Sequence, residues 1–229
     1  MVQAGGVSTS TDSLADLLGG RRGALDATVP PVAFALGWLL SGQVIGWGAG
    51  AAVVAAGAVA VWRTSRGEKV TAVLGGLAAV VVGALVALYT GRAEDFFLLQ
   101  LLSNTASALA WALSTLVRWP FLGIVVGLLL RQRTRWRKDP DLLRAYCRTS
   151  WVWTATYVLR VVVFGLLWWS GQVVALTVAR VALSWPLVAL AVGISAWLVP
   201  RSLPADHPGF LHPRVPGEQR PEGGGPAAG

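Results

Sequence analysis

Long apolar runs, separated by short polar breaks, fill the chain from Val29 to Val199. A helix rises about 1.5 Å per residue, so about 20 apolar residues cross the hydrocarbon core of a bilayer. The run from Phe96 to Leu130 would be about 52 Å long as one straight helix, well beyond the ~30 Å core, so it must bend or divide. The pattern predicts an all-α fold, a polytopic bundle of transmembrane helices.

Composition supports a membrane protein and excludes several other classes. Hydrophobic residues make up 55% of the chain and charged residues 13%, against roughly 25% charged in soluble domains. A water-soluble enzyme with one core and a largely disordered chain are both excluded. Cys147 is the single cysteine, which excludes a disulfide scaffold. His207 and His212 both lie near the C-terminus, so the apolar spans contain no histidine that could bind a metal ion. We therefore expect no metal site in the spans and no cofactor.

About six spans are expected, arranged as three helical hairpins that turn on small, glycine-containing sequences. The expected spans are 28–41, 44–62, 70–89, a fourth within 96–130, 151–169 and 172–199. The transmembrane domain is thus predicted at 28–199, between a mostly disordered N-terminal segment, 1–27, and a disordered Pro- and Gly-rich tail, 200–229.

Two arrangements are open for the fourth span. The segment that begins at Trp119-Pro120 resembles the one that begins at Trp185-Pro186, and both suggest a proline inside a span, followed by a half-helix. On this basis we expect a kinked helix over 102–130, with residues 92–101 as a short outer helix or re-entrant piece. The alternative is a helix at 96–117, with Arg118 at the membrane surface and 120–130 lying along it.

The basic residues indicate the orientation. If each span crosses once, fifteen of the 19 basic residues lie on one side, and Arg92 is alone on the other. Such a bias places both termini in the cytoplasm. The net charge of +8 does not predict nucleic-acid binding, because the basic residues lie between apolar spans rather than on one polar face.

Polar residues inside the spans are the candidates for binding. They fall on helix faces at spacings of three and four, and include Asn104, Arg118, Tyr157, Arg160 and Arg180. Two interpretations are open. The arginines brace the bundle through hydrogen bonds, or they meet and bind an anion or an anionic lipid, because no carboxylate lies at their depth. No catalytic set is found, so an enzyme is not expected.

Several motifs resemble a bacterial family of multi-pass membrane proteins of unknown function, over about residues 12–200. They are Gly19-Gly20-Arg21-Arg22-Gly23, Pro30-Pro31, Thr90-Gly91-Arg92-Ala93-Glu94-Asp95-Phe96-Phe97, Asn104, Arg118-Trp119-Pro120 and Trp136-Arg137-Lys138-Asp139-Pro140. The third string is the most specific, and its Arg92, Glu94, Asp95, Phe96 and Phe97 form a candidate outer-face motif. A looser similarity to intracellular septation protein A rests on topology and on this acidic-aromatic segment.

The resemblance implies a multi-pass protein of the bacterial inner membrane and no established activity. The expected function is non-enzymatic support of envelope assembly or division, with the bilayer, anionic lipid and other envelope membrane proteins as partners. The alternative is a small transporter or flippase for an anionic lipid or metabolite, which would use the intramembrane arginines.

Overall fold

The computed structural model describes residues 20–131, 134–205, 207–209 and 213–214. Within these ranges the structure contains helices and no strands. The elements are α2 (Gly20–Leu40), α3 (Ile45–Ser65), α4 (Val70–Thr90), η1 (Ala93–Phe97), α5 (Leu98–Leu116), α6 (Phe121–Leu129), η2 (Arg135–Lys138), α7 (Pro140–Trp169), α8 (Val173–Ala182) and α9 (Trp185–Arg201). The all-α class predicted from the sequence is confirmed for the described residues.

Five helical stretches are long and apolar enough to cross a membrane. They are Ile45–Ser65, Val70–Thr90, Ala93–Leu116, Pro140–Trp169 and Val173–Arg201. A sixth apolar stretch, Thr28–Leu40, is shorter and forms the second half of α2. Many large apolar side chains of these helices are exposed in the isolated chain, as expected for surfaces that face lipid.

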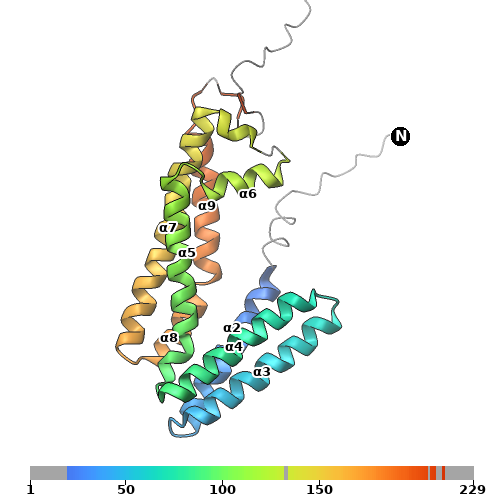
Figure 1. Ribbon diagram of the computed structural model, residues 1–229, viewed down its shortest axis with the longest axis vertical. Helices are drawn as coiled ribbons and strands as arrows, with labels where there is room; N and C mark the ends of the chain where they lie inside the picture. Colours follow the sequence, from blue (N-terminus) through green and yellow to red (C-terminus); the bar gives the residue numbers. More distant parts are fainter. Residues whose placement is uncertain (1–19, 132–133, 206, 210–212, 215–229) are drawn as a thin grey trace, which may run out of the picture. The chain divides into compact units, whose positions relative to one another are not determined.

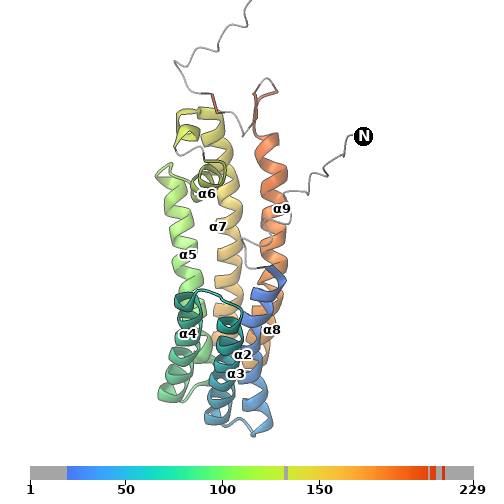
Figure 2. The same ribbon diagram turned by 90° about the vertical axis from the view of Figure 1, so that its right-hand side faces the viewer.

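The chain forms two compact units. The described part of the first unit is 20–102 with 162–185, and that of the second is 103–161 with the residues from Pro186 onward. In the first unit, α2, α3 and α4 lie side by side, and α8 packs against α2 and η1 (Figures 1 and 2). In the second unit, α5, α7 and α9 run alongside one another, and α6 lies across their direction (Figures 1 and 2).

The first unit is held together by close helix contacts at small residues. A Cβ atom on Gly37 of α2 would lie 2.8 Å from the carbonyl oxygen of Trp47 on α3. A Cβ atom on Gly48 would lie 2.9 Å from the carbonyl oxygen of Phe34. Only glycine permits such backbone contact, which is the usual means of packing helices in a membrane.

The kinked helix expected over 102–130 is wrong. Helix α5 ends at Leu116, and α6 begins at Phe121. Two hydrogen bonds close the end of α5, from Arg118 N to the Thr115 carbonyl and from Trp119 N to the Ser114 carbonyl, in the pattern of a Schellman motif. Pro120 then disfavours helical geometry at Trp119, so the helix stops instead of bending. This boundary agrees with the alternative helix at 96–117.

The second Trp-Pro sequence also marks a break rather than a kink. Helix α8 ends at Ala182, and α9 starts at Trp185, directly before Pro186. Proline is well accommodated in the first turn of a helix, where its missing N–H is not needed. The half-helix expected after this proline is α9, which continues to Arg201, two residues beyond the expected span end at 199.

The ends of the chain differ from the expectation where they are described. The helix expected at 28–41 already begins at Gly20. The tail expected to start at residue 200 has ordered first residues, since α9 includes Arg201, and His207 and Arg214 make hydrogen bonds described below. The rest of the two predicted terminal segments, residues 1–19, 206, 210–212 and 215–229, lies outside the described residues.

Candidate functional site

The candidate outer-face motif begins at the surface of the first unit, with Arg92 exposed, and its Asp95, Phe96 and Phe97 are buried. Arg92 Nε donates to Glu94 Oε1 at 2.8 Å, and Asp95 Oδ1 accepts a hydrogen bond from Trp168 Nε1 at 2.8 Å. The Arg92 guanidinium also lies 5.0 Å from the Trp168 ring centroid. The string therefore ties the start of η1 to the end of α7.

The two phenylalanines of the motif are buried in the same core. Phe96 stacks on Phe34 of α2 with ring centroids 4.1 Å apart, and Phe97 meets Phe96 edge to face at 5.2 Å. A Cβ atom on Gly83 of α4 would lie 2.8 Å from the Phe96 carbonyl oxygen, so α4 approaches η1 closely. These contacts give the motif a packing role in the first unit.

Arg160 lies nine residues before the end of α7 at Trp169, about 14 Å along the helix and close to half the thickness of the hydrocarbon core. Its guanidinium carbon is 5.3 Å from the Tyr157 ring centroid. Trp111 of α5 stacks on Trp153 of α7 at 5.3 Å, which sets the register of these antiparallel helices. Asn104, which is 3% exposed, precedes Trp111 by the same seven residues by which Arg160 follows Trp153.

This register brings some of the predicted polar residues to one depth and separates others. Asn104, Tyr157 and Arg160 share a level of the second unit. Arg118 lies seven residues beyond Trp111 in the opposite direction, so it is about 20 Å from Arg160 along the helix axes. Arg180 belongs to α8 of the first unit. Arg118 and Arg160 therefore do not contact one anion together.

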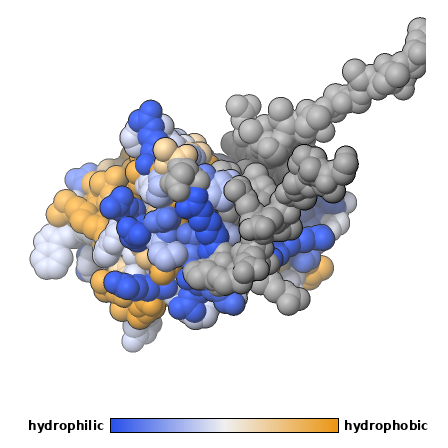
Figure 3. Space-filling model, turned by 90° about the horizontal axis from the view of Figure 1, so that it is seen from above, coloured by the Kyte–Doolittle hydropathy of each residue, from blue (hydrophilic) through white to orange (hydrophobic). Residues whose placement is uncertain are grey.

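Arg118 instead marks the start of a basic end of the second unit, which comprises α6, η2 and the first turns of α7. Helix α6 has nine residues and is about 14 Å long, too short to cross a bilayer. Several of its apolar side chains are exposed, among them Phe121, Ile124, Val125, Leu128 and Leu129. Figure 3 views this end of the molecule and shows hydrophilic residues gathered beside apolar ones.

Two arginines flank α6 in an unusual backbone conformation. Arg118 has φ 54° and Arg131 has φ 53°, in the left-handed region that side chains other than glycine rarely adopt. At both positions glycine would adopt this backbone conformation with less strain. Arginine at each end of a short apolar helix gives this end two cations beside an exposed apolar surface.

The 3₁₀ helix η2 packs against α6 through Trp136, which is 1% exposed. A Cβ atom on Gly123 of α6 would lie 2.8 Å from the Trp136 ring, so glycine is needed there. The guanidinium of Arg137 lies 3.7 Å from the centroid of the Trp119 ring, a cation–π contact. Arg137 thereby contacts Trp119, the residue that follows Arg118, and η2 as a whole lies against α6.

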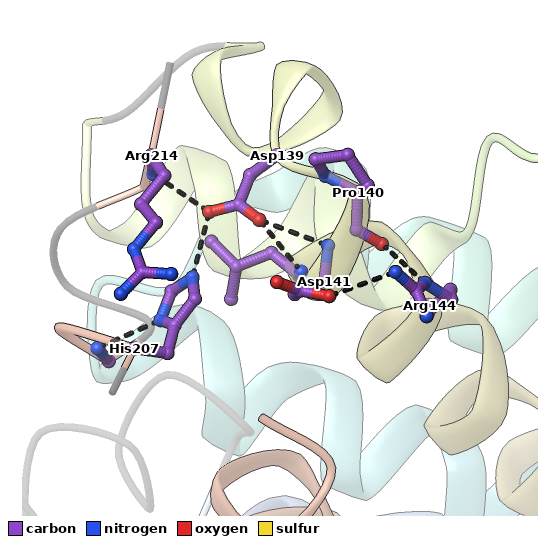
Figure 4. Close-up of polar contacts among 8 residues, drawn as sticks. Asp139, Pro140, Asp141, Arg144, His207 and Arg214 are labelled. Atoms are coloured by element: carbon purple, nitrogen blue, oxygen red, sulfur yellow. Dashed lines mark hydrogen bonds and ion pairs between the residues drawn. The ribbon is translucent and has the colours of Figure 1, made fainter. Parts of the chain in front are cut away.

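Asp139 forms a buried polar centre directly after η2 (Figure 4). Its Oδ1 accepts hydrogen bonds from the backbone N–H groups of Asp141 at 3.0 Å and Leu142 at 3.2 Å, so Asp139 is the N-cap of α7. Its Oδ2 is 2.9 Å from His207 Nε2 and accepts the Arg214 backbone N–H at 2.7 Å. The side chains of His207 and Asp139 are 0% and 1% exposed.

The contacts of His207 indicate its tautomer. The Gly209 backbone N–H donates to His207 Nδ1 at 3.0 Å, so Nδ1 is an acceptor, and Nε2 carries the proton given to Asp139. Both ring nitrogens are thus in use, which leaves no lone pair for a metal ion or a general base. Burial alone would raise the pKa of Asp139, but the hydrogen bonds from Arg214, His207 and Leu142 together lower it below the ordinary value of 3.8.

The pair of Asp139 and His207 was missed in the sequence, although part of the signal was present. Asp followed by Pro is a typical helix start, with an N-cap and a proline in the first turn. Nothing in the sequence pairs Asp139 with a histidine 68 residues later. No group of three or more His, Cys, Asp or Glu residues suited to a metal ion occurs within the described part of the chain.

Comparison with known proteins identifies a family but no activity. Residues 18–206 match the family described as "Protein of unknown function (DUF3159)", so the chain belongs to that family. No curated protein and no solved structure matches the chain. The predicted membership of a family of unknown function is confirmed at this level, whereas the similarity to intracellular septation protein A finds no support in these comparisons.

Proposed function

We propose that this protein is a non-enzymatic, multi-pass protein of the bacterial inner membrane that binds anionic phospholipid headgroups at its basic end. The observation that carries the proposal is α6, a short, exposed apolar helix with Arg118 and Arg131 at its two ends and Arg137 beside it. An apolar surface rimmed by cations suits the boundary between acyl chains and phosphate groups. Support of envelope assembly or division is the role we propose for such binding.

The proposed topology has six spans in three hairpins, with both termini in the cytoplasm. The sixth proposed span is α2, whose 21 residues are about 31 Å long and whose apolar part is the shorter stretch Thr28–Leu40. The 30 residues of α7 are about 45 Å long, so its first turns, with Arg144 and Arg148, extend beyond the hydrocarbon. The basic end would then lie at the cytoplasmic surface, as the positive-inside rule requires.

The test compares phospholipids that differ in charge. The full chain, purified in a neutral detergent, should melt at a higher temperature with phosphatidylglycerol than with phosphatidylcholine, because a ligand of the folded state stabilises it. The variant Arg118→Gln/Arg131→Gln/Arg137→Gln should lose most of this difference. A matched control, Arg63→Gln/Arg66→Gln in the 63–69 loop, should keep it. Equal effects of the two lipids on the wild type would contradict the proposal.

A second candidate is passage of an anionic lipid or metabolite, with Arg160 as its binding residue. It is favoured by the position of Arg160 about half a bilayer from the end of α7, level with buried Asn104 and against Tyr157. Placing a charged arginine inside the hydrocarbon core costs free energy, so an arginine found there is a candidate functional residue. If Arg160 binds an anion, a polyprenyl phosphate should stabilise the wild type and not Arg160→Gln. If Arg160 is a brace, the variant should melt lower by the same amount with and without that lipid.

A further inference from the structure

The segment that follows α9 returns to the basic end of the second unit. Its described residues, 202–205, 207–209 and 213–214, are called the strap below. The strap contacts Asp139 through two donors, the His207 imidazole and the Arg214 backbone N–H. Figure 4 shows His207 and Arg214 approaching one oxygen of Asp139, while α7 approaches the other.

The strap also has an apolar contact. Leu203 packs against the buried cluster of the second unit, which consists of Leu122, Trp136, Leu142, Tyr146 and Val199. This cluster includes Trp136 of η2, so the strap contacts the structure around η2 through apolar packing as well as through hydrogen bonds. Buried hydrogen bonds together with apolar packing hold a segment more firmly than a surface ion pair does.

The short helix η2 is thus held from two sides. On one side Trp136 meets Gly123 of α6, and Arg137 covers Trp119. On the other side Asp139, which follows Lys138 at the end of η2, is bound by the strap. A four-residue helix has little stability of its own, so the position of Arg137 depends on both attachments.

We propose that the strap positions η2 and thereby sets the geometry of the lipid-binding end, with His207 as the positioning residue. This inference rests on the proposed binding of anionic lipid and assigns its regulation to the C-terminal segment. His207 suits the role because it is buried, fixed as one tautomer and bonded at both nitrogens. Any event that draws the strap away from Asp139 would free η2 and weaken lipid binding without touching the arginines.

The test uses the full chain in detergent and two substitutions at one position. His207→Gln keeps an N–H donor for Asp139, and His207→Leu removes it at similar volume. Trypsin cleavage after Arg214 reports strap docking, and cleavage after Arg137 reports the order of η2. His207→Leu should raise both cleavage rates by about tenfold or more, as loss of a buried charged hydrogen bond implies. It should also at least halve the stabilisation by phosphatidylglycerol, and His207→Gln should resemble the wild type in every measurement.

Other outcomes separate the two proposals. Faster cleavage after Arg214 alone, with unchanged cleavage after Arg137 and unchanged lipid stabilisation, would show that the strap docks without positioning η2. An unchanged rate after Arg214 would show that docking does not depend on His207, and it too overturns the inference. If the wild type shows no preference for phosphatidylglycerol, the proposed function fails, and cleavage after Arg137 still decides whether the strap orders η2. Should His207→Leu not fold, Asp139→Asn replaces it, with Asp141→Asn as the matched control for lost charge.

Discussion

At the scale of single residues, Asp139 combines burial with four hydrogen-bond donors, two from α7 and two from the strap. A carboxylate that is buried and well hydrogen-bonded stabilises the folded state only while it is ionised. Its lowered pKa therefore makes a pH-dependent contribution. The contribution is present in full above the unfolded value of 3.8 and is lost as the pH falls through the lower folded value.

We predict that Asp139→Asn melts at a lower temperature than the wild type near neutral pH, by a stability loss of about 2 kcal/mol. The loss comes from the strap side, since asparagine still caps α7. The difference between wild type and variant should shrink between about pH 5 and pH 3, as the pH falls below 3.8. Thermal melts of both proteins across this range check it, with Asp141→Asn, whose exposed partner is Arg144, as the control. A difference that grows toward acid would contradict the assignment.

At the scale of the helices, the positions of long apolar helices could be predicted from the sequence, because hydrophobic length determines them. The break between α5 and α6 was missed, because local backbone conformation determines it. Runs of about 20 apolar residues predicted the ends of α3 to within three residues and those of α4 to within one. The division between α5 and α6 was predicted as a kink, because a proline within an apolar run is compatible with both outcomes. Arg118, two residues after the end of α5, has a left-handed backbone conformation that the sequence does not indicate. Glycine or asparagine is the residue usually found in that conformation at a helix end.

The candidate site shows the same limit. Polar spacing correctly placed Tyr157 and Arg160 on one face of α7, one turn apart and in contact. It did not give the register between α5 and α7, which stacking of Trp111 on Trp153 determines. Without that register the sequence grouped Arg118 with Arg160. The contact between His207 and Asp139 could not be predicted from the sequence, because tertiary packing brings together two segments that are 68 residues apart.

The left-handed arginines give a prediction in which stability and function change in opposite directions. Arg118→Gly and Arg131→Gly each relieve backbone strain of about 1 kcal/mol, so each variant should melt as high as the wild type or higher. Each should also show less stabilisation by phosphatidylglycerol, because a cation beside α6 is lost. Gln43→Gly, which relieves similar strain at φ 70° in the turn between α2 and α3, should keep the lipid effect. Melts with and without phosphatidylglycerol check all three, and full lipid stabilisation of both arginine variants would contradict a role in binding.

At the scale of the whole molecule, charge on the loops is the property that predicts an orientation in the membrane. The connection between α4 and α5, residues 91–97 with η1 included, carries Arg92 with Glu94 and Asp95, so its net charge is negative. The connection between α3 and α4, residues 63–69 with the last turn of α3 included, carries Arg63, Arg66 and Lys69 against Glu68 alone. Retention of Lys and Arg in the cytoplasm during insertion thus favours opposite sides for these two loops.

We predict that the turns at Arg92 and Gln172 face outward and that the 63–69 loop and the first turns of α7 face the cytoplasm. In a Cys147→Ala background, a membrane-impermeant maleimide added to intact cells should label Arg92→Cys and Gln172→Cys and spare Ser65→Cys and Arg144→Cys. All four should be labelled after permeabilisation, because each replaced residue is exposed. Labelling of Ser65→Cys in intact cells would reverse the orientation. Labelling of Arg92→Cys but not Gln172→Cys would instead show an odd number of crossings between them, and the six-span topology would have to be abandoned.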